Sequence, residues 1–136
     1  MKAPLRLPAI YFHQNSTEFI KKPDLKGEKS SKKALRHIIN LMKSRPEISK
    51  LEISGYCDFT ETDSTLGMQR ARKLLGYMIS SGLDSNRFSL KGFHDTRYLV
   101  SQEEIDKVES KLEIEKLHLL NRRVEFQVIY TEKKSK

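Results

Sequence analysis

The apolar positions of the chain change their spacing from block to block, and these changes predict alternating strands and helices. Residues 8–12 form a short apolar and aromatic run, which is typical of a buried strand. Over residues 31–45 the apolar side chains recur at i, i+3, i+4 and i+7, which predicts an amphipathic helix. Ser30 or Ser31 is a suitable N-cap for this helix, and Pro46 ends it.

A second strand, a second helix and a third strand follow. Apolar and polar residues alternate over 51–56, which predicts a strand, and again over 88–92. The helix between them is expected to begin at Asp63 or Ser64, both good N-caps, and to end before Gly82 at the C′ position.

An added helix is predicted before the last strand. Ser101 and Glu104 form a capping box at the start of a helically spaced segment, about 102–119, and residues 124–130 alternate like a strand. The order βαβαβ(α)β predicts the fold class as an α/β (α+β) sandwich, with helices packed against a mixed four-stranded sheet.

This topology brings separated polar segments to one edge of the sheet. If the first two strands are parallel, their C-terminal ends coincide, so the turn 13–15 lies beside Asp58 and the second helix. A last strand antiparallel to the third would begin at the same edge, with residues 121–123. Arg70 should lean back toward the N-terminus of its helix. Asp58 and Arg70 together suit a zwitterionic ligand.

The length of the chain and its net charge limit the number of domains and the classes of partner. The 136 residues fit one domain with its core at about 8–130, and the single Cys57 excludes an internal disulfide. The net charge of +8 first suggests nucleic acid. Much of it lies in a basic loop, 21–33, and a basic tail, 131–136, which we expect to be disordered. Because neither holds aromatic residues for base stacking, a nucleic-acid partner is not expected.

Motifs of catalysis, metal binding and membrane insertion do not occur in the sequence. It lacks G-x-S-x-G, H-E-x-x-H and P-loop patterns, so we expect no enzyme and no cofactor. The histidines have no metal-ligand spacing, and the acidic cluster Asp58, Glu61 and Asp63 lacks the glycine of a calcium loop, so no metal is expected. No apolar run is long enough to span a membrane. A membrane contact would require a tether outside this sequence, and we expect a fragment of a longer exported protein.

Three motifs, in order, resemble the OmpA-like peptidoglycan-binding domains, which include the peptidoglycan-associated lipoprotein and the periplasmic domain of flagellar stator proteins. Residues 53–58, ISGYCD, resemble I-x-G-[HY]-x-D; residues 66–71, LGMQRA, resemble L-[SG]-x-x-R-A; and residues 121–125 read NRRVE. Weaker similarity covers 10–19 and 80–96, so the resemblance extends over most of the chain.

The resemblance implies non-covalent binding of the diaminopimelate residue of peptidoglycan stem peptides, which would anchor an envelope protein to the cell wall in the periplasm. Asp58 would accept the ligand's ammonium group and Arg70 would hold its carboxylate, as charge-assisted hydrogen bonding favours. Asn15 would line the same pocket and Arg123 its rim. The full set of expected ligand-binding residues is Asp58, Arg70, Asn15, Thr60, Asp63 and Arg123.

Two alternatives remain open from the sequence. The loop from Asp58 to Arg70 spans 70 − 58 = 12 positions, which is shorter than is usual in the family. The same fold could therefore have lost the wall ligand and act as a protein–protein interaction or assembly domain with envelope partners.

The two arginines before the last strand also have an alternative role. For at least one of Arg122 and Arg123 we expect a structural ion pair, with Asp95 or near Glu125, rather than a ligand contact.

Overall fold

The computed structural model describes residues 7–23, 29–93 and 100–129. Its strands are β1 (Ile10–Tyr11), β2 (Lys50–Gly55), β3 (Phe88–Gly92) and β4 (Arg123–Ile129). Its helices are α1 (Ser31–Ser44), α2 (Leu66–Ser80), the 3-10 turn η1 (Ser85–Arg87), α3 (Gln102–Asp106) and α4 (Lys111–Asn121). The predicted mixed α/β architecture is confirmed.

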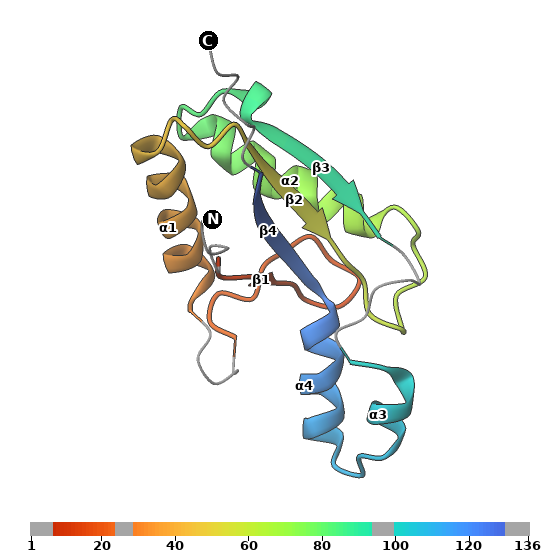
Figure 1. Ribbon diagram of the computed structural model, residues 1–136. Coiled ribbons are helices and arrows are strands. Elements are labelled where there is room, and N and C mark those ends of the chain that lie inside the picture. The colour runs from red at the N-terminus through yellow and green to blue at the C-terminus, as the bar shows by residue number, and fades with distance from the viewer. Residues whose placement is uncertain (1–6, 24–28, 94–99, 130–136) are drawn as a thin grey trace.

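The four strands form one sheet in the order β1-β4-β2-β3 (Figure 1). β4 runs antiparallel to both of its neighbours, and β2 runs parallel to β3. Tyr11 and Gly55, at the ends of β1 and β2, pair with Arg123 and Val124 at the start of β4. The predicted convergence of these segments at one edge is therefore confirmed.

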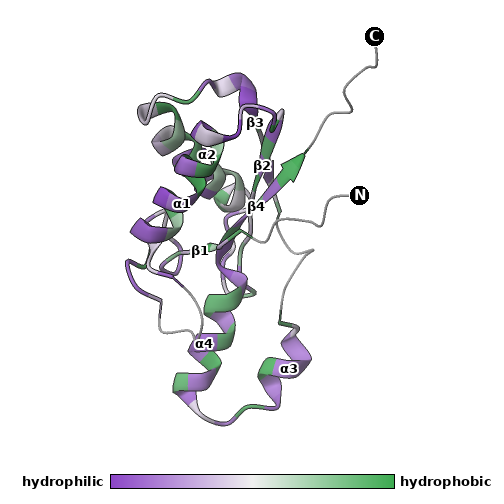
Figure 2. Ribbon diagram, turned by 60° about the vertical axis from the view of Figure 1, so that its left-hand side comes forward, coloured by the Kyte–Doolittle hydropathy of each residue, from purple (hydrophilic) through white to green (hydrophobic). Residues whose placement is uncertain are grey.

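The helices α1 and α2 cover the same face of the sheet (Figure 2). Ile38 of α1 and Leu74 of α2 share one core with Leu51 and Ile53 of β2, and all four side chains are fully buried. Burial of side chains of this size contributes roughly 1.5–3 kcal/mol each. On β2 the intervening Glu52 is only partly buried, so the alternation in the sequence does separate a core face from a polar face.

Several predicted helix ends are confirmed, and one differs. The Ser30 side chain caps α1 by accepting from the Lys33 N–H, and Gly82 follows α2 with φ 95°. However, α2 begins at Leu66, later than expected, because Asp63 instead makes a turn. Its Oδ1 accepts hydrogen bonds from the Thr65 N–H and hydroxyl, at 2.9 and 2.7 Å.

The segment predicted as a single helix over 102–119 forms two helices, α3 and α4. The predicted capping box at the start of α3 is confirmed. The helix α3 then ends, and α4 begins as a separate helix because Ser110 caps it by accepting a hydrogen bond from the Glu113 N–H. The two helices project away from the rest of the fold, beyond the edge where β2 ends (Figures 1 and 2).

Two glycines bring the first turn of α2 close to β2. A Cβ on Gly55 would lie 1.8 Å from the carbonyl oxygen of Gly67, and a Cβ on Gly67 would lie 2.6 Å from that of Gly55. The backbones can therefore approach only because neither residue has a side chain. This approach carries Arg70, one turn further along α2, over the ends of β1 and β2.

Some sequence predictions fall outside the described residues. These are the basic tail 131–136, the middle of the basic loop (24–28) and the proposed partner Asp95. Among the described helices, none has the length and apolar character needed to cross a membrane.

Candidate functional site

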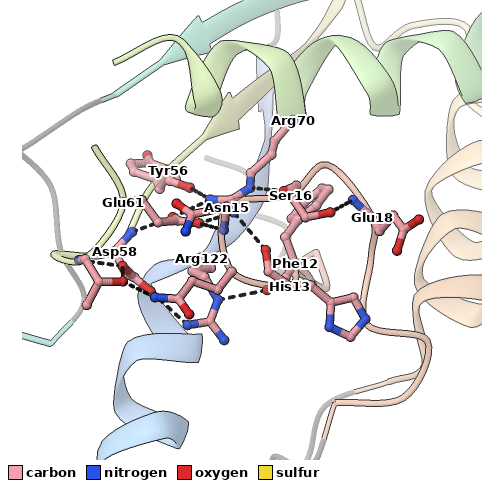
Figure 3. A network of polar contacts seen from close by, with 12 residues as sticks. Phe12, His13, Asn15, Ser16, Glu18, Tyr56, Asp58, Glu61, Arg70 and Arg122 are labelled. Carbon is pink, nitrogen blue, oxygen red and sulfur yellow. Dashed lines mark hydrogen bonds and ion pairs between the residues drawn. The ribbon is translucent and has the colours of Figure 1, made fainter. Parts of the chain in front are cut away.

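Arg70 lies at the centre of a buried polar network on the sheet edge (Figure 3). Its side chain is fully buried, and its Nε and Nη atoms donate to the carbonyl oxygens of Ser16, Tyr56 and His13 at 3.0, 2.9 and 3.1 Å. Its two Nη atoms also donate to the two oxygens of Glu61. Because a guanidinium has five N–H donors, this arrangement engages all of them within the protein.

Glu61 supplies the charge that balances Arg70. Its carboxylate also accepts hydrogen bonds from two backbone N–H groups, that of Asn15 at 2.8 Å and that of Asp58 at 2.9 Å. The Glu61 side chain has no exposed surface. A buried carboxylate needs such partners, because an unpaired charge away from water is strongly unfavourable.

Asp58 forms a second buried ion pair, with Arg122. Its Oδ1 accepts from the Thr60 N–H at 2.7 Å and the Thr60 hydroxyl at 2.6 Å, and its Oδ2 accepts from Arg122 Nη1 at 2.8 Å. Arg122 also donates to the carbonyl oxygen of Phe12 and to Glu115 of α4. Burial lowers the pKa of Arg122, but the hydrogen bonds to Asp58 and Glu115 and the negative charges of these two residues together outweigh burial and raise the pKa above its usual value.

The remaining expected ligand-binding residues differ in exposure. Asn15, Thr60 and Asp63 are exposed, and the Gln14 side chain donates to the Thr60 hydroxyl at 2.6 Å. Asn15 has φ 53°, in the left-handed region that asparagine tolerates. Together with Asp58 and Arg70, Asn15 and Thr60 surround one network, and Asp63 lies on the turn that leads from it into α2.

Arg123 takes a different position from its neighbour Arg122. Its guanidinium lies 3.8 Å from the ring centroid of Tyr56, and its Nε donates to Glu125 at 2.6 Å. The expected structural ion pair is present: Arg123 pairs with Glu125, and Arg122 pairs with Asp58, a partner that the sequence does not indicate.

Cys57 lies next to this network and is buried. Burial raises the pKa of its thiol from 9.0 to about 11, against the opposing effect of the nearby Arg70. The thiol is therefore neutral near pH 7 and poorly suited to act as a nucleophile.

The sequence does not indicate the roles of Glu61 and Glu115, or which carboxylate pairs with Arg122. In the sequence Glu61 stands out only as part of an acidic cluster, yet in the structure it is the partner of Arg70. The one feature of the sequence that could indicate this pairing is the short loop after Asp58, because a short loop keeps the Glu61 carboxylate close to Arg70. Among the described residues, no group of three or more histidine, cysteine, aspartate or glutamate side chains could hold a metal ion.

The mixed sheet, the helices on one face and the charged rim define an OmpA-like domain. A comparison with protein-family models matches residues 11–111 to the OmpA family. The chain therefore belongs to the OmpA family, which confirms the family resemblance. A search of curated proteins finds no match.

Solved structures share the fold at low sequence identity. The OmpA-like domain of FopA1 from Francisella tularensis subsp. tularensis SCHU S4 has a TM-score of 0.61 at 22% identity, over 91% of this chain and 74% of that chain. The peptidoglycan-associated lipoprotein from Burkholderia pseudomallei has a TM-score of 0.66 at 15% identity, over 88% of each chain. The periplasmic domain of Helicobacter pylori MotB has a TM-score of 0.64 at 16% identity, over 95% of this chain and 83% of that one.

Proposed function

We propose that this chain binds peptidoglycan without covalent chemistry and anchors an envelope protein to the cell wall. The observation that carries the proposal is the meeting of Asn15, Asp58 and Arg70, from three separate segments, around one carboxylate. Membership of the OmpA family and the likeness to a peptidoglycan-associated lipoprotein support it. The periplasm is the matching compartment, and the tether belongs to a part of the protein outside this sequence.

The finer proposal is that the ligand is the diaminopimelate residue of a stem peptide. Its ammonium group would bind at the acidic end of the rim, where Asp58 and Asp63 lie, and its carboxylate would bind at Arg70. Asn15 and Thr60 offer exposed polar groups beside these charges, and Arg123 would contribute from the start of β4. Within the peptide this residue keeps one ammonium group and one carboxylate on its side chain, and this pair of opposite charges matches an acid beside a base.

Co-sedimentation with insoluble peptidoglycan tests the proposal. Because Asp58 and Arg70 are buried, their substitution would confuse loss of binding with loss of folding. The exposed Asp63 is a better probe, and we expect Asp63→Asn to weaken retention about tenfold, as loss of a charge-assisted contact does. Wild-type protein that stays in the supernatant would contradict anchoring.

Asp84→Asn is the matched control for Asp63→Asn. Asp84 also accepts a hydrogen bond from a backbone N–H two residues ahead, at 2.9 Å, but it lies before the start of β3, at the end of the strands away from the rim. The variant Asp84→Asn should therefore leave retention unchanged. Peptidoglycan that carries lysine instead of diaminopimelate tests the finer claim, because lysine lacks the second carboxylate. Retention that disappears in moderate salt for every variant would implicate the lysine side chains instead.

A second candidate function is protein–protein assembly without wall binding. One observation favours it, namely that Arg70 has no N–H donor left for a ligand. The projecting helices α3 and α4 would then supply the contact surface, and Leu112 of α4 is 67% exposed. If the wild type and all rim variants remain folded but do not sediment with peptidoglycan, the result supports this candidate over the first.

A further inference from the structure

Glu61 is held in the way that a bound ligand carboxylate is held. Its two oxygens receive four hydrogen bonds, two from the Arg70 guanidinium and one each from the N–H groups of Asn15 and Asp58. A guanidinium fork with converging backbone N–H groups is a recurrent way to bind an anion. The donors come from three separate parts of the fold, whereas the acceptor comes from one loop.

Two of the residues that supply these donors, Arg70 and Asp58, have attachments besides Glu61. Arg70 is fixed by α2 and by the carbonyl oxygens of His13, Ser16 and Tyr56. Asp58 comes shortly after β2, which ends at Gly55, and its side chain is held by Arg122. The receptor for a carboxylate is thus built into the rim.

The loop that carries Glu61 is irregular and largely exposed. Residues 59–65 form neither helix nor strand, and Thr60, Thr62, Asp63, Ser64 and Thr65 are exposed. Glu61 is the buried residue of this segment, so its withdrawal would expose one side chain and leave the apolar core in place.

We propose that Arg70 and the backbone N–H groups of Asn15 and Asp58 form a carboxylate-binding site that Glu61 of the same chain occupies. A ligand carboxylate binds there only by displacing Glu61. Glu61 therefore lowers the apparent affinity for any carboxylate ligand. It favours a ligand whose contacts elsewhere on the rim compensate for the loss of the hydrogen bonds to Glu61. That this ligand is the wall peptide rests on the proposed function, whereas the occupied site does not.

Chemical rescue with acetate tests the occupied site directly. Glu61→Ala in the full chain removes the internal carboxylate and leaves space for a small one. We expect its Tm to fall well below that of the wild type in sodium chloride, and to rise by about 5 °C when chloride is replaced by 0.2 M acetate at equal ionic strength, since a ligand that binds the folded state stabilises it. The wild type should not respond, because its site is filled.

Three controls separate site binding from a general effect of acetate. Acetamide has nearly the shape of acetate without the charge and should not rescue Glu61→Ala. Glu61→Gln fills the space with an amide and should not respond to acetate. Glu47→Ala removes the carboxylate partner of the exposed Arg45, 3.4 Å away, and should not respond either.

Each outcome decides the proposal. A folded Glu61→Ala that gains no more from acetate than from chloride or acetamide overturns it. So does a Glu61→Ala protein that is unfolded in chloride and does not recover a cooperative transition in acetate. Acetate rescue without any retention on peptidoglycan would uphold the occupied site and contradict the proposed function. Rescue together with at least tenfold stronger retention of Glu61→Ala would uphold both.

Discussion

The carboxylate of Glu61 and the guanidinium of Arg70 form a two-point ion pair in which neither side chain has exposed surface. The pair joins the loop after β2 to the first half of α2. Burial of two charges is costly, and the cost is offset here because the remaining donors and acceptors are also engaged. The same pair therefore connects the loop to α2 at the rim where we propose that a ligand binds.

Removal of one partner of this pair should be far more damaging than its contact alone suggests. Arg70→Met leaves Glu61 as an uncompensated buried charge, so we expect a loss of about 3–5 kcal/mol in the free energy of unfolding, measured by urea denaturation. The double variant Arg70→Met, Glu61→Gln should lose less than the sum of the two single variants. Arg45→Met, in an exposed pair with Glu47, should cost at most about 1 kcal/mol. Additive effects in the buried pair would contradict its coupling.

The pair between Arg122 and Asp58 depends on the planar shape of the guanidinium. Arg122 reaches Phe12, Asp58 and Glu115 through three different nitrogen atoms. A lysine amine cannot reproduce this fork, so Arg122→Lys should destabilise the fold by about 2 kcal/mol. Arg36→Lys, at an exposed position of α1, is the matched control and should be nearly neutral. Equal denaturation midpoints for the two variants would refute this role for Arg122.

The contact between α2 and β2 should tolerate no side chain at Gly55. A Cβ there would lie 1.8 Å from a backbone oxygen, so Gly55→Ala forces the helix away from the sheet and should prevent stable folding at 37 °C. Gly76→Ala makes the same chemical change within α2, where a Cβ meets nothing within 4 Å. It should raise stability by up to about 1 kcal/mol. Thermal unfolding followed by circular dichroism distinguishes these opposite signs.

Alkaline pH should weaken the fold through Cys57. Because burial raises the pKa of the thiol from 9.0 to about 11, the folded state holds this proton more tightly than the unfolded state. Its contribution is fully present below about pH 9 and is lost as the pH rises to about 11. Over that window the wild type should lose about 2–3 kcal/mol more than Cys57→Ala. Parallel stability curves for the two proteins would show that the thiol is not responsible.

The parts of the fold that follow from periodicity were predictable. Alternation over 51–56 and 88–92 located β2 and β3, and Ser30 and Gly82 marked helix ends through backbone chemistry. Once the strand directions were set, the joint placement of Asp58 and Arg70 on one rim followed.

The parts that depend on side-chain direction in irregular segments were not predictable. Glu61 turns inward from a loop that has no periodic pattern to indicate a buried face. In the adjacent pair Arg122 and Arg123, the sequence does not show which one meets Asp58, because a shift of one residue exchanges the two faces of a strand. The break between α3 and α4 depends on a second cap at Ser110, which competes with continued helical spacing.

Ligand binding at this rim can be measured by NMR, in a titration of the isotope-labelled full chain with a soluble stem peptide that contains diaminopimelate. We expect the largest shifts on the backbone N–H groups of Asn15, Asp58 and Thr60 and on the Nε–H of Arg70. Glu61→Ala should reach the same shifts at a lower peptide concentration. No shifts at millimolar peptide in either protein, or shifts confined to the lysines that flank α1, would contradict binding at this rim.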